Sequence, residues 1–343
     1  MATQRLLHAI PVAVQPKARL KFARASLYPG VSLRKAEGPL ARKVADRFNT
    51  RPVAPGFAAT HLICIDENAY FEGLDERLLA AGDTREKGDY SHVDLDGLTR
   101  QVLIALTLRS RCVWKVGGSC TFDNSDPNFP YSYSSVSYGH RNTQRISDLL
   151  SYSAPDGWFL DTRSGELRAT CNQLDCYYRS GTWWVDRLSV ALGYLWSGLT
   201  TSHPELSFVA FCMAIEAIAS TSQNEITHIL AEWCAILTQA SGKDRVLMYK
   251  KVKDLYALRS KIVHGRSAPR KGFMNWETLA ITAKQSLVPR LALFGMLDVT
   301  IQVINAVLSR SEFLDILHVR RSEEKSSKAL DEYFQSLLLQ REA

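Results

Sequence analysis

Two basic side chains near the end of one predicted helix could act together on a phosphodiester. Arg259 and His264 stand five positions apart in LYALRSKIVHG, a segment patterned like a helix that ends at Gly265. Histidine exchanges protons near neutral pH, and arginine offers a planar fork of donors that matches two phosphate oxygens. These residue types therefore suit RNA cleavage, in which the 2′-hydroxyl of the RNA is the nucleophile.

Helical spacing alone does not bring these two side chains together. Five positions correspond to about 140° around the axis, so Arg259 and His264 do not share a face of a straight helix. They converge only if the helix loosens at its end, which Gly265 permits, or if a second copy of the chain completes the site. Taken alone, His264 is explained more simply as a histidine that complements the helix dipole.

Glu216 is the only acidic or basic residue in the segment FVAFCMAIEAIA, residues 208–219. A buried carboxylate without a partner is costly, so we expect Glu216 to be paired or protonated. Arg259 is its natural partner, and Glu216 would then hold the guanidinium in place. The alternative is that Glu216 points to solvent.

Basic residues cluster around this pair. Residues 243–271 contain ten Lys or Arg and two acidic residues, while the net charge of the whole chain is +7. The positive excess therefore lies in this window, and it favours a polyanionic partner such as RNA. The residues that could bind backbone phosphates are Lys250, Lys251, Lys253, Lys261, Arg266, Arg270 and Lys271. Each of them taken singly is explained more simply as part of a solvated helix face.

The elements that would position these residues are helices. After Thr182, apolar residues recur at steps of three and four. The pattern predicts helices over residues 184–199, over 202–220 with a capping box, from 222 with another, over about 244–264, and over about 276–308 with a kink near Pro289. Short links between them favour an antiparallel bundle.

The first half of the chain has a different pattern. The short β-prone pieces HLICI, RCVWKV, YSYSSVSY and CYYRSGTWWV alternate with turn-rich segments and with one helix over about residues 95–108. A chain of 343 residues is long enough to bury two cores. We therefore predict an α+β domain over residues 1–180, an all-α antiparallel helical bundle over 181–310, and an amphipathic helix over 311–343.

Composition limits the class of protein. With 46% hydrophobic and 22% charged residues, the chain is neither disordered nor fibrous. The seven cysteines include no C-x-x-C pair, which favours a reduced, cytoplasmic protein without a zinc site. The most apolar late segment, residues 287–308, carries Arg290 and Asp298, which argues against a membrane span.

The helical half resembles a known family. The segment VDRLSVALGYLWSGLTTSHPELSFVAFCMAIEAIAS, followed by DLYALRSKIVHG and a long last helix, is similar to the HEPN superfamily, in particular its Apea-like branch from phage-defence systems. The resemblance covers about residues 183–308. The family signature is an arginine, four to six residues, and a histidine, here Arg259 to His264. A second match, Arg85 to His92, lies in a charged, turn-rich segment and is interpreted as coincidence.

The resemblance implies an activity and a site. The chain would be a metal-independent endoribonuclease without a cofactor, a homodimeric antiviral hydrolase or toxin in the cytoplasm. Arg259 and His264 would be catalytic, with Glu216 and Ser260 supporting them. Ser260 stands where many catalytic members have Asn, Asp or His. Whether His264 acts as general acid or general base stays open.

Two further expectations concern regulation and alternatives. Residues 1–180 would sense a trigger of phage or host origin, because a cytoplasmic ribonuclease must be kept inactive until it is needed. No tyrosine stands two residues after His264, so we do not expect control by modification of such a tyrosine. The alternatives are a non-catalytic HEPN module that binds RNA or a nucleotide and dimerises, and a scaffold for a partner protein.

Overall fold

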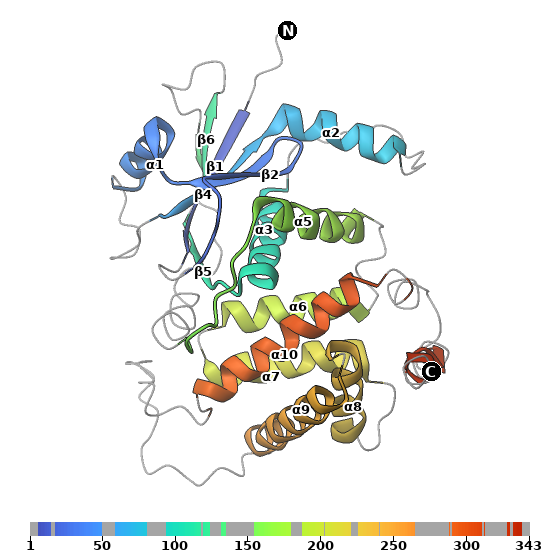
Figure 1. Cartoon of the computed structure of the whole chain (residues 1–343). Coiled ribbons are helices and arrows are strands. Elements are labelled where there is room, and N and C mark those ends of the chain that lie inside the picture. Colours follow the sequence, from blue (N-terminus) through green and yellow to red (C-terminus); the bar gives the residue numbers. More distant parts are fainter. Residues whose placement is uncertain are drawn as a thin grey trace, which may run out of the picture. The chain divides into compact units, whose positions relative to one another are not determined.

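The computed structural model describes most of the chain and divides it into two compact units (Figure 1). The described residues are 6–14, 18–49, 59–80, 94–117, 119–123, 132–134, 154–179, 187–201, 203–220, 226–239, 241–264, 288, 290–310, 312, 328–329 and 332–337. The first unit comprises Met1–Gln144 and Asp156–Cys176. The second comprises Arg145–Pro155 and Tyr177–Ala343.

The first unit contains an antiparallel sheet. Its strand order is β2-β3-β4-β1-β6-β7, and β5 also pairs with β1. The strands are β1 (Leu6–Val14), β2 (Arg24–Tyr28), β3 (Val31–Lys35), β4 (His61–Asp66), β5 (Trp114–Val116), β6 (Ser119–Asp123) and β7 (Ser132–Ser134). The central strand β1 pairs with β4 along one side and with both β5 and β6 along the other.

The central strand contains a proline, a residue that cannot donate a backbone hydrogen bond. On the side of β1 away from β4, Ala9 is paired with β6, and Val12 is paired with β5. Pro11 lies where one partner gives way to the other, and its carbonyl accepts a hydrogen bond of 2.8 Å from the Gly117 N–H. The position at which Pro11 lacks an N–H therefore falls between β5 and β6, so the pairing of β1 with neither strand is interrupted.

Helices cover the sheet of the first unit. They are α1 (Gly38–Asn49), α2 (Glu67–Ala80), α3 (Leu95–Ser110) and α5 (Ser164–Arg179), of which α5 runs on into the second unit. Leu40 and Val44 of α1 pack against a cluster that includes Leu62 and Phe122 of the sheet. From β2, the Tyr28 hydroxyl donates a hydrogen bond of 2.7 Å to the carbonyl of Cys171 in α5.

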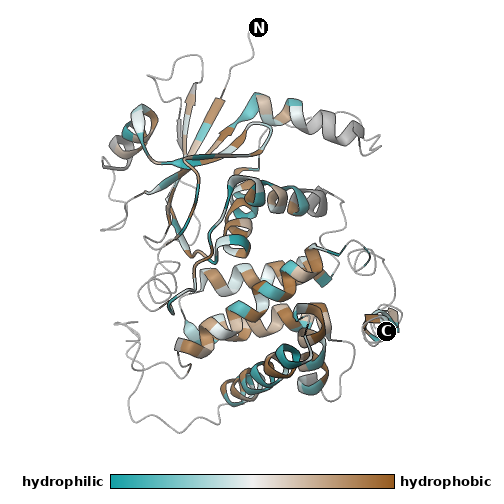
Figure 2. Cartoon of the chain, in the orientation of Figure 1, coloured by the Kyte–Doolittle hydropathy of each residue, from teal (hydrophilic) through white to brown (hydrophobic). Residues whose placement is uncertain are grey.

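The described elements of the second unit are helices. They are α6 (Arg187–Thr200), α7 (Pro204–Ala219), α8 (Ile226–Thr238), α9 (Gly242–Val263) and α10 (Arg290–Leu308). Figure 2 shows hydrophilic residues along α9 next to hydrophobic ones. From the C-terminal segment, the buried ring of Phe334 stacks on Trp233 of α8, with 4.0 Å between the ring centroids. This part of the tail therefore packs on α8.

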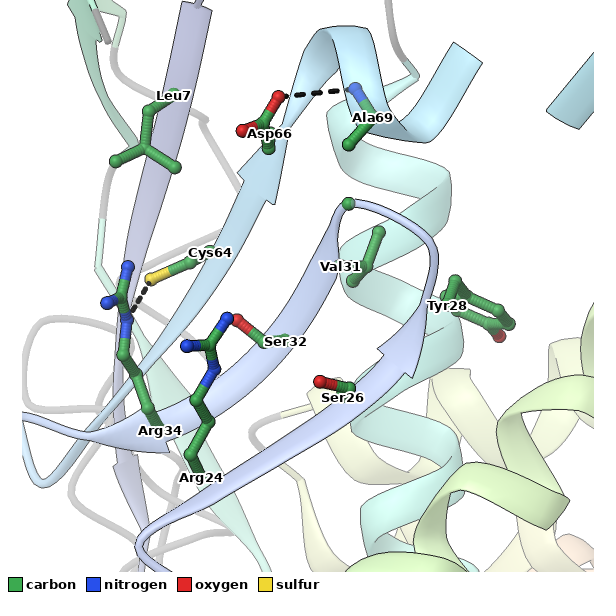
Figure 3. Close-up of a pocket in the computed structure, with 11 residues that line it drawn as sticks. Leu7, Arg24, Ser26, Tyr28, Val31, Ser32, Arg34, Cys64, Asp66 and Ala69 are labelled. Carbon is green, nitrogen blue, oxygen red and sulfur yellow. Dashed lines mark hydrogen bonds between the residues drawn. The ribbon is translucent and has the colours of Figure 1, made fainter. Parts of the chain in front are cut away.

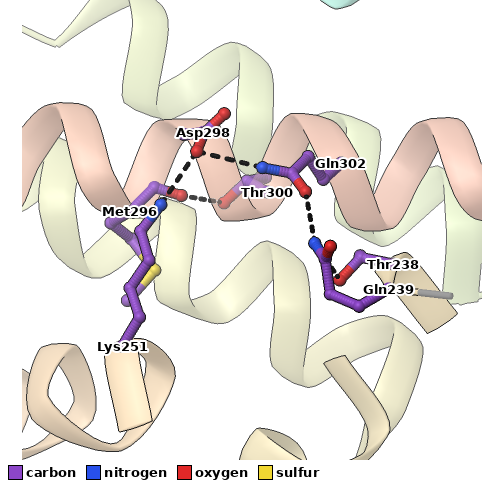
Figure 4. Close-up of polar contacts among 7 residues, drawn as sticks. All are labelled: Thr238, Gln239, Lys251, Met296, Asp298, Thr300 and Gln302. Carbon is purple, nitrogen blue, oxygen red and sulfur yellow. Dashed lines mark hydrogen bonds and ion pairs between the residues drawn. The ribbon is translucent and has the colours of Figure 1, made fainter. Parts of the chain in front are cut away.

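A polar network joins three helices of the second unit (Figure 4). The Lys251 ammonium of α9 lies 2.8 Å from Oδ2 of Asp298 in α10, and the Gln302 amide donates to the same oxygen at 3.0 Å. Directly after α8, the Gln239 amide donates to the Gln302 side-chain carbonyl at 3.1 Å. These bonds fix α9 and the end of α8 against one side of α10.

The predicted fold class was wrong. The first unit contains an antiparallel sheet, and both units contain helices. The all-α antiparallel bundle expected over residues 181–310 is not confirmed. That prediction required short links between successive helices, and residues 265–287, between α9 and α10, lie outside the described residues. The long helix predicted from about residue 276, with a kink at Pro289, is described only from Arg290.

Two local predictions were also wrong. The piece CYYRSGTWWV was expected to be a strand, but its first four residues form the end of α5. The capping box expected at residues 202–205 does not begin α7. The N-cap residue is instead His203, whose side chain forms no capping hydrogen bond, and Pro204 starts the helix. The second capping box, over residues 222–225, lies outside the described residues.

Cysteines and the most apolar helix bear on where the protein resides. Six of the cysteines are free and buried, namely Cys64, Cys112, Cys120, Cys171, Cys212 and Cys234. Burial raises the pKa of both Cys112 and Cys234 to about 12. By length and composition, one described helix could cross a membrane, over Leu291–Leu308, but 61% of that stretch is buried inside the fold. The core helix of a soluble protein has the same character, and this is consistent with a soluble protein.

Candidate functional site

Helices α7 and α9 contact each other where the candidate residues lie. The Ser241 hydroxyl accepts a hydrogen bond of 3.1 Å from the Asp244 N–H and so caps the start of α9. One face of α9 is buried and includes Val252, Leu255 and Tyr256. From this face, the Tyr256 hydroxyl donates a hydrogen bond of 3.0 Å to the carbonyl of Cys212 in α7. The two helices are thereby held in a fixed register.

Arg259 and Glu216 continue this contact by one helical turn. A terminal nitrogen of Arg259 lies 3.4 Å from Oε1 of Glu216, and their side chains are 29% and 24% exposed. Glu216 follows Cys212 by four positions and Arg259 follows Tyr256 by three, so both pairs use the same faces of α7 and α9. The ion pair expected from the sequence is therefore present, and Glu216 does not point freely to solvent.

The surroundings of this ion pair are partly apolar. Burial raises the pKa of the Glu216 carboxyl, and the positive charge of Arg259 opposes that rise. The Nε atom of Arg259 is buried and has no hydrogen-bond partner within the described residues. The protein groups described in the structure therefore leave part of the donor capacity of Arg259 unused.

His264 lies at the end of α9 and is exposed. Its backbone N–H donates a hydrogen bond of 3.0 Å to the Ser260 carbonyl, the ordinary spacing of an α-helix. The helix is thus regular up to His264 and does not loosen before it. The side chains of Arg259 and His264 consequently leave α9 about 140° apart.

The histidine shares its face of α9 with other candidate residues. Lys250, Lys253, Ala257, Ser260 and His264 follow each other at steps of three and four, and all five are exposed. We call these five residues the α9 stripe. Ser260 therefore lies with His264 and away from Arg259. Lys261 is also exposed and borders the stripe.

The remaining predicted RNA-binding residues have other surroundings. Lys251 forms the ion pair with Asp298, so its ammonium is engaged within the protein. The Lys253 ammonium lies 5.9 Å from the centroid of the Tyr249 ring, a cation–π arrangement. Arg266, Arg270 and Lys271 lie outside the described residues, as do Arg85 and His92 of the second signature match.

Sequence reasoning missed Tyr256 as part of this site. Tyr256 is buried, and burial raises the pKa of its hydroxyl well above the usual value. Its hydroxyl remains a neutral donor to α7 and orients the turn that carries Arg259. The helical pattern contained the signal, because Tyr256 lies three positions before Arg259 on the face that also bears Val252.

Comparison with known proteins gives no relative from which roles could be transferred. No family model, curated protein or solved structure matches the chain. The resemblance to the HEPN superfamily therefore stays a prediction made from the residues. In the part of the chain that the structure describes, no three His, Cys, Asp or Glu side chains gather closely enough to hold a metal ion.

Proposed function

We propose that the protein is a metal-independent endoribonuclease of the HEPN type, acting in the cytoplasm in antiviral defence. The observation that supports this proposal best is the pairing of Arg259 with Glu216 at 3.4 Å, on the helix that ends at the exposed His264. A fixed cation and a group that transfers protons are what cleavage by the 2′-hydroxyl requires.

The proposed reaction needs only proton transfers and charge stabilisation. The 2′-oxygen of the RNA attacks the adjacent phosphorus and loses its proton, and the bond from phosphorus to the 5′-oxygen breaks. The products are a 2′,3′-cyclic phosphate and a 5′-hydroxyl. Arg259 stabilises the negative charge on the phosphoryl oxygens. Glu216 positions Arg259, and His264 transfers a proton either from the 2′-hydroxyl or to the 5′-oxygen.

The geometry of α9 favours a site shared between two chains. Arg259 faces α7 and His264 faces solvent, about 140° away. We therefore propose a homodimer in which one protomer supplies Arg259 and its partner supplies the histidine at each phosphate. Val263 is 48% exposed beside His264 and offers an apolar contact for the second chain. The α9 stripe, with Lys250 and Lys253, would follow the RNA backbone.

A cleavage assay with matched variants tests the proposal. Wild-type protein, Arg259→Ala, His264→Ala and His203→Ala are incubated with single-stranded RNA. We expect the first two substitutions to abolish cleavage and His203→Ala to leave it intact, since His203 only occupies the N-cap position of α7 without a side-chain bond there. Equal loss of cleavage in His203→Ala, or full cleavage by His264→Ala, would count against the assignment.

Mixed dimers test the shared site. If Arg259 and His264 of different chains act together, mixing Arg259→Ala with His264→Ala protein restores one complete site per mixed dimer. We then expect partial activity from two preparations that are inactive separately. Activity that never returns on mixing, with exchange of subunits shown by mass spectrometry, would contradict a composite site.

A second candidate function is a non-catalytic module that binds RNA or a nucleotide and dimerises. The observation that favours it is that Arg259 lies on the side of α9 opposite the exposed α9 stripe, where Glu216 neutralises it. This function predicts that wild type and His264→Ala bind RNA equally and that neither cleaves it. Under either proposal residues 1–180 bind the activating trigger, and deletion of these residues should alter regulation in infected cells.

A further inference from the structure

A pocket of about 400 Å³ opens on the sheet of the first unit (Figure 3). Sites for small molecules typically have volumes of about 300–1,000 Å³. Three neighbouring strands contribute polar residues to its lining, which include Arg24 and Ser26 of β2, Ser32 and Arg34 of β3, and Cys64 and Asp66 of β4. Sequence reasoning singled out none of them for a function.

Strand register places these side chains on one face of the sheet. Arg24 is directly opposite Arg34, and Ser26 is directly opposite Ser32. Ser32 is in turn paired with Cys64 of β4. Alternate residues of a strand point to the same face, so the polar side chains of β2 and β3 share a face with Leu62 and Cys64 of β4. This face is apolar where α1 covers it and polar over β2 and β3. Figure 3 shows both arginines projecting toward the same space.

The two arginines carry charge that the described protein does not neutralise. Like charges directly opposite each other on neighbouring strands destabilise a sheet. Neither arginine forms an ion pair with a carboxylate within the described residues. Arg34 Nε instead donates to the Cys64 sulfur at 2.9 Å, which leaves its terminal nitrogens available. Burial raises the pKa of the Cys64 thiol, and the charges of Arg34 and Arg24 oppose that rise, so both guanidinium groups lie near it.

The acidic end of the pocket lies away from the arginines. Asp66 Oδ1 accepts a hydrogen bond of 3.2 Å from the Ala69 N–H at the start of α2. Leu62 is opposite Arg34, and Asp66 is four residues further along β4, which corresponds to about 13 Å. The pocket therefore has a basic end, two serine hydroxyls in the middle and a carboxylate at the far end.

We propose that this pocket binds a small molecule through a phosphate or pyrophosphate group held by Arg24 and Arg34. Two neighbouring guanidinium groups require about two negative charges, which a phosphate monoester supplies near pH 7 and a single carboxylate does not. Ser26 and Ser32 provide hydroxyl donors beside the anion. Asp66 suits a hydroxyl or amino group at the other end of the ligand. The site lies in the first unit and does not depend on ribonuclease activity.

Isothermal titration calorimetry of the full chain with pyrophosphate, at constant ionic strength, tests this site. We expect wild-type protein to bind pyrophosphate, and Arg24→Gln and Arg34→Gln each to bind about tenfold or more weakly, since each loses a charge-assisted contact. Lys35→Gln is the matched control. This substitution removes the same charge from the position of β3 that follows Arg34. The Lys35 side chain is exposed and projects to the opposite face of the sheet.

The outcomes separate a specific site from general attraction. Absence of pyrophosphate binding by wild type, unchanged binding by Arg24→Gln, or an equal loss in Lys35→Gln each overturns the proposal. Thermal unfolding of every variant shows that it is folded. If Arg34→Gln does not fold, the result for Arg24→Gln alone tests the proposal, because Arg24 is exposed and its side chain forms no hydrogen bond or ion pair within the described residues.

Discussion

Gly198 of α6 offers a sharp test of how α6 and α7 pack. A Cβ atom placed on Gly198 would lie 2.4 Å from Cε1 and 2.6 Å from Cδ1 of Phe211 in α7. Ordinary contact between carbon atoms needs about 3.5–4.0 Å, so the ring would have to move by more than about 1 Å. Phe211 is completely buried, so its ring can move only by displacing neighbouring side chains in the core. Gly198→Ala should therefore force the two helices apart.

The magnitude follows from two opposing effects. Overpacking of a buried core costs about 1–3 kcal/mol. Alanine in place of glycine inside a helix gains about 0.5–1 kcal/mol. We therefore expect Gly198→Ala to lower the free energy of unfolding by about 1 kcal/mol, within a range of about 0–2.5 kcal/mol. Gly242→Ala, at the start of α9, is the matched control, because nothing lies within 4 Å of its added Cβ. It should leave the stability unchanged or raise it slightly.

Urea unfolding followed by circular dichroism measures the difference. The unfolding midpoint should fall for Gly198→Ala and not for Gly242→Ala, with the same dependence on urea concentration in both variants. A Gly198→Ala protein that is more stable than wild type, by the full gain of about 0.5–1 kcal/mol expected of alanine in a helix without a clash, would refute the close approach of Phe211 to α6. The register of α7, which also carries Glu216, would then need revision.

Two further predictions concern the network in Figure 4 and the histidines of the sheet. Asp298→Asn should cost about 1–2 kcal/mol, because Asp298 accepts bonds from both Lys251 and Gln302. A double-mutant cycle with Lys251→Met that shows no coupling would contradict this. Burial lowers the pKa values of His8 and His61, so their protonation opposes folding. Stability should therefore fall as the pH drops below about 6.5, and a His61→Gln protein with the same pH dependence as wild type would exclude His61 as a cause.

Individual helices were predictable from the sequence because their patterns are local. The helix predicted over residues 95–108 is α3, and the helix predicted to end at His264 is α9, which ends at Val263. Apolar periodicity and turn residues suffice for such elements. The strand β1 was missed because His8 and Pro11 interrupt its apolar pattern, and only its pairing with β4, β5 and β6 makes it the centre of the sheet.

The arrangement of elements was less predictable than the elements themselves. Tyr177 and Tyr178 favour a strand locally, yet they lie in the last turn of α5, which shows that strand propensity over a few residues is a weak guide. The all-α bundle was inferred from short links, and the chain between α9 and α10 lies mostly outside the described residues, so this argument is not confirmed. The pocket around Arg24 and Arg34 depends on strand register, which one sequence does not specify.

The candidate site was partly predictable. The ion pair of Glu216 with Arg259 followed from the cost of burying an isolated carboxylate, and the structure contains it. The five-residue spacing already placed Arg259 and His264 on different faces, and the regular end of α9 keeps them apart. That Lys251 is held by Asp298 was not predictable, since Asp298 lies 47 positions further along the chain.

The chemical identity of RNA ends tests the central claim most directly. Wild-type protein is incubated with a single-stranded RNA in EDTA, and the new 3′ ends are analysed by mass spectrometry. A 2′-hydroxyl that attacks the neighbouring phosphorus leaves a 2′,3′-cyclic phosphate, and we predict this product without added metal. An RNA that stays intact in EDTA and is cleaved once a divalent metal is restored, or new ends that carry a 3′-hydroxyl, would contradict the account.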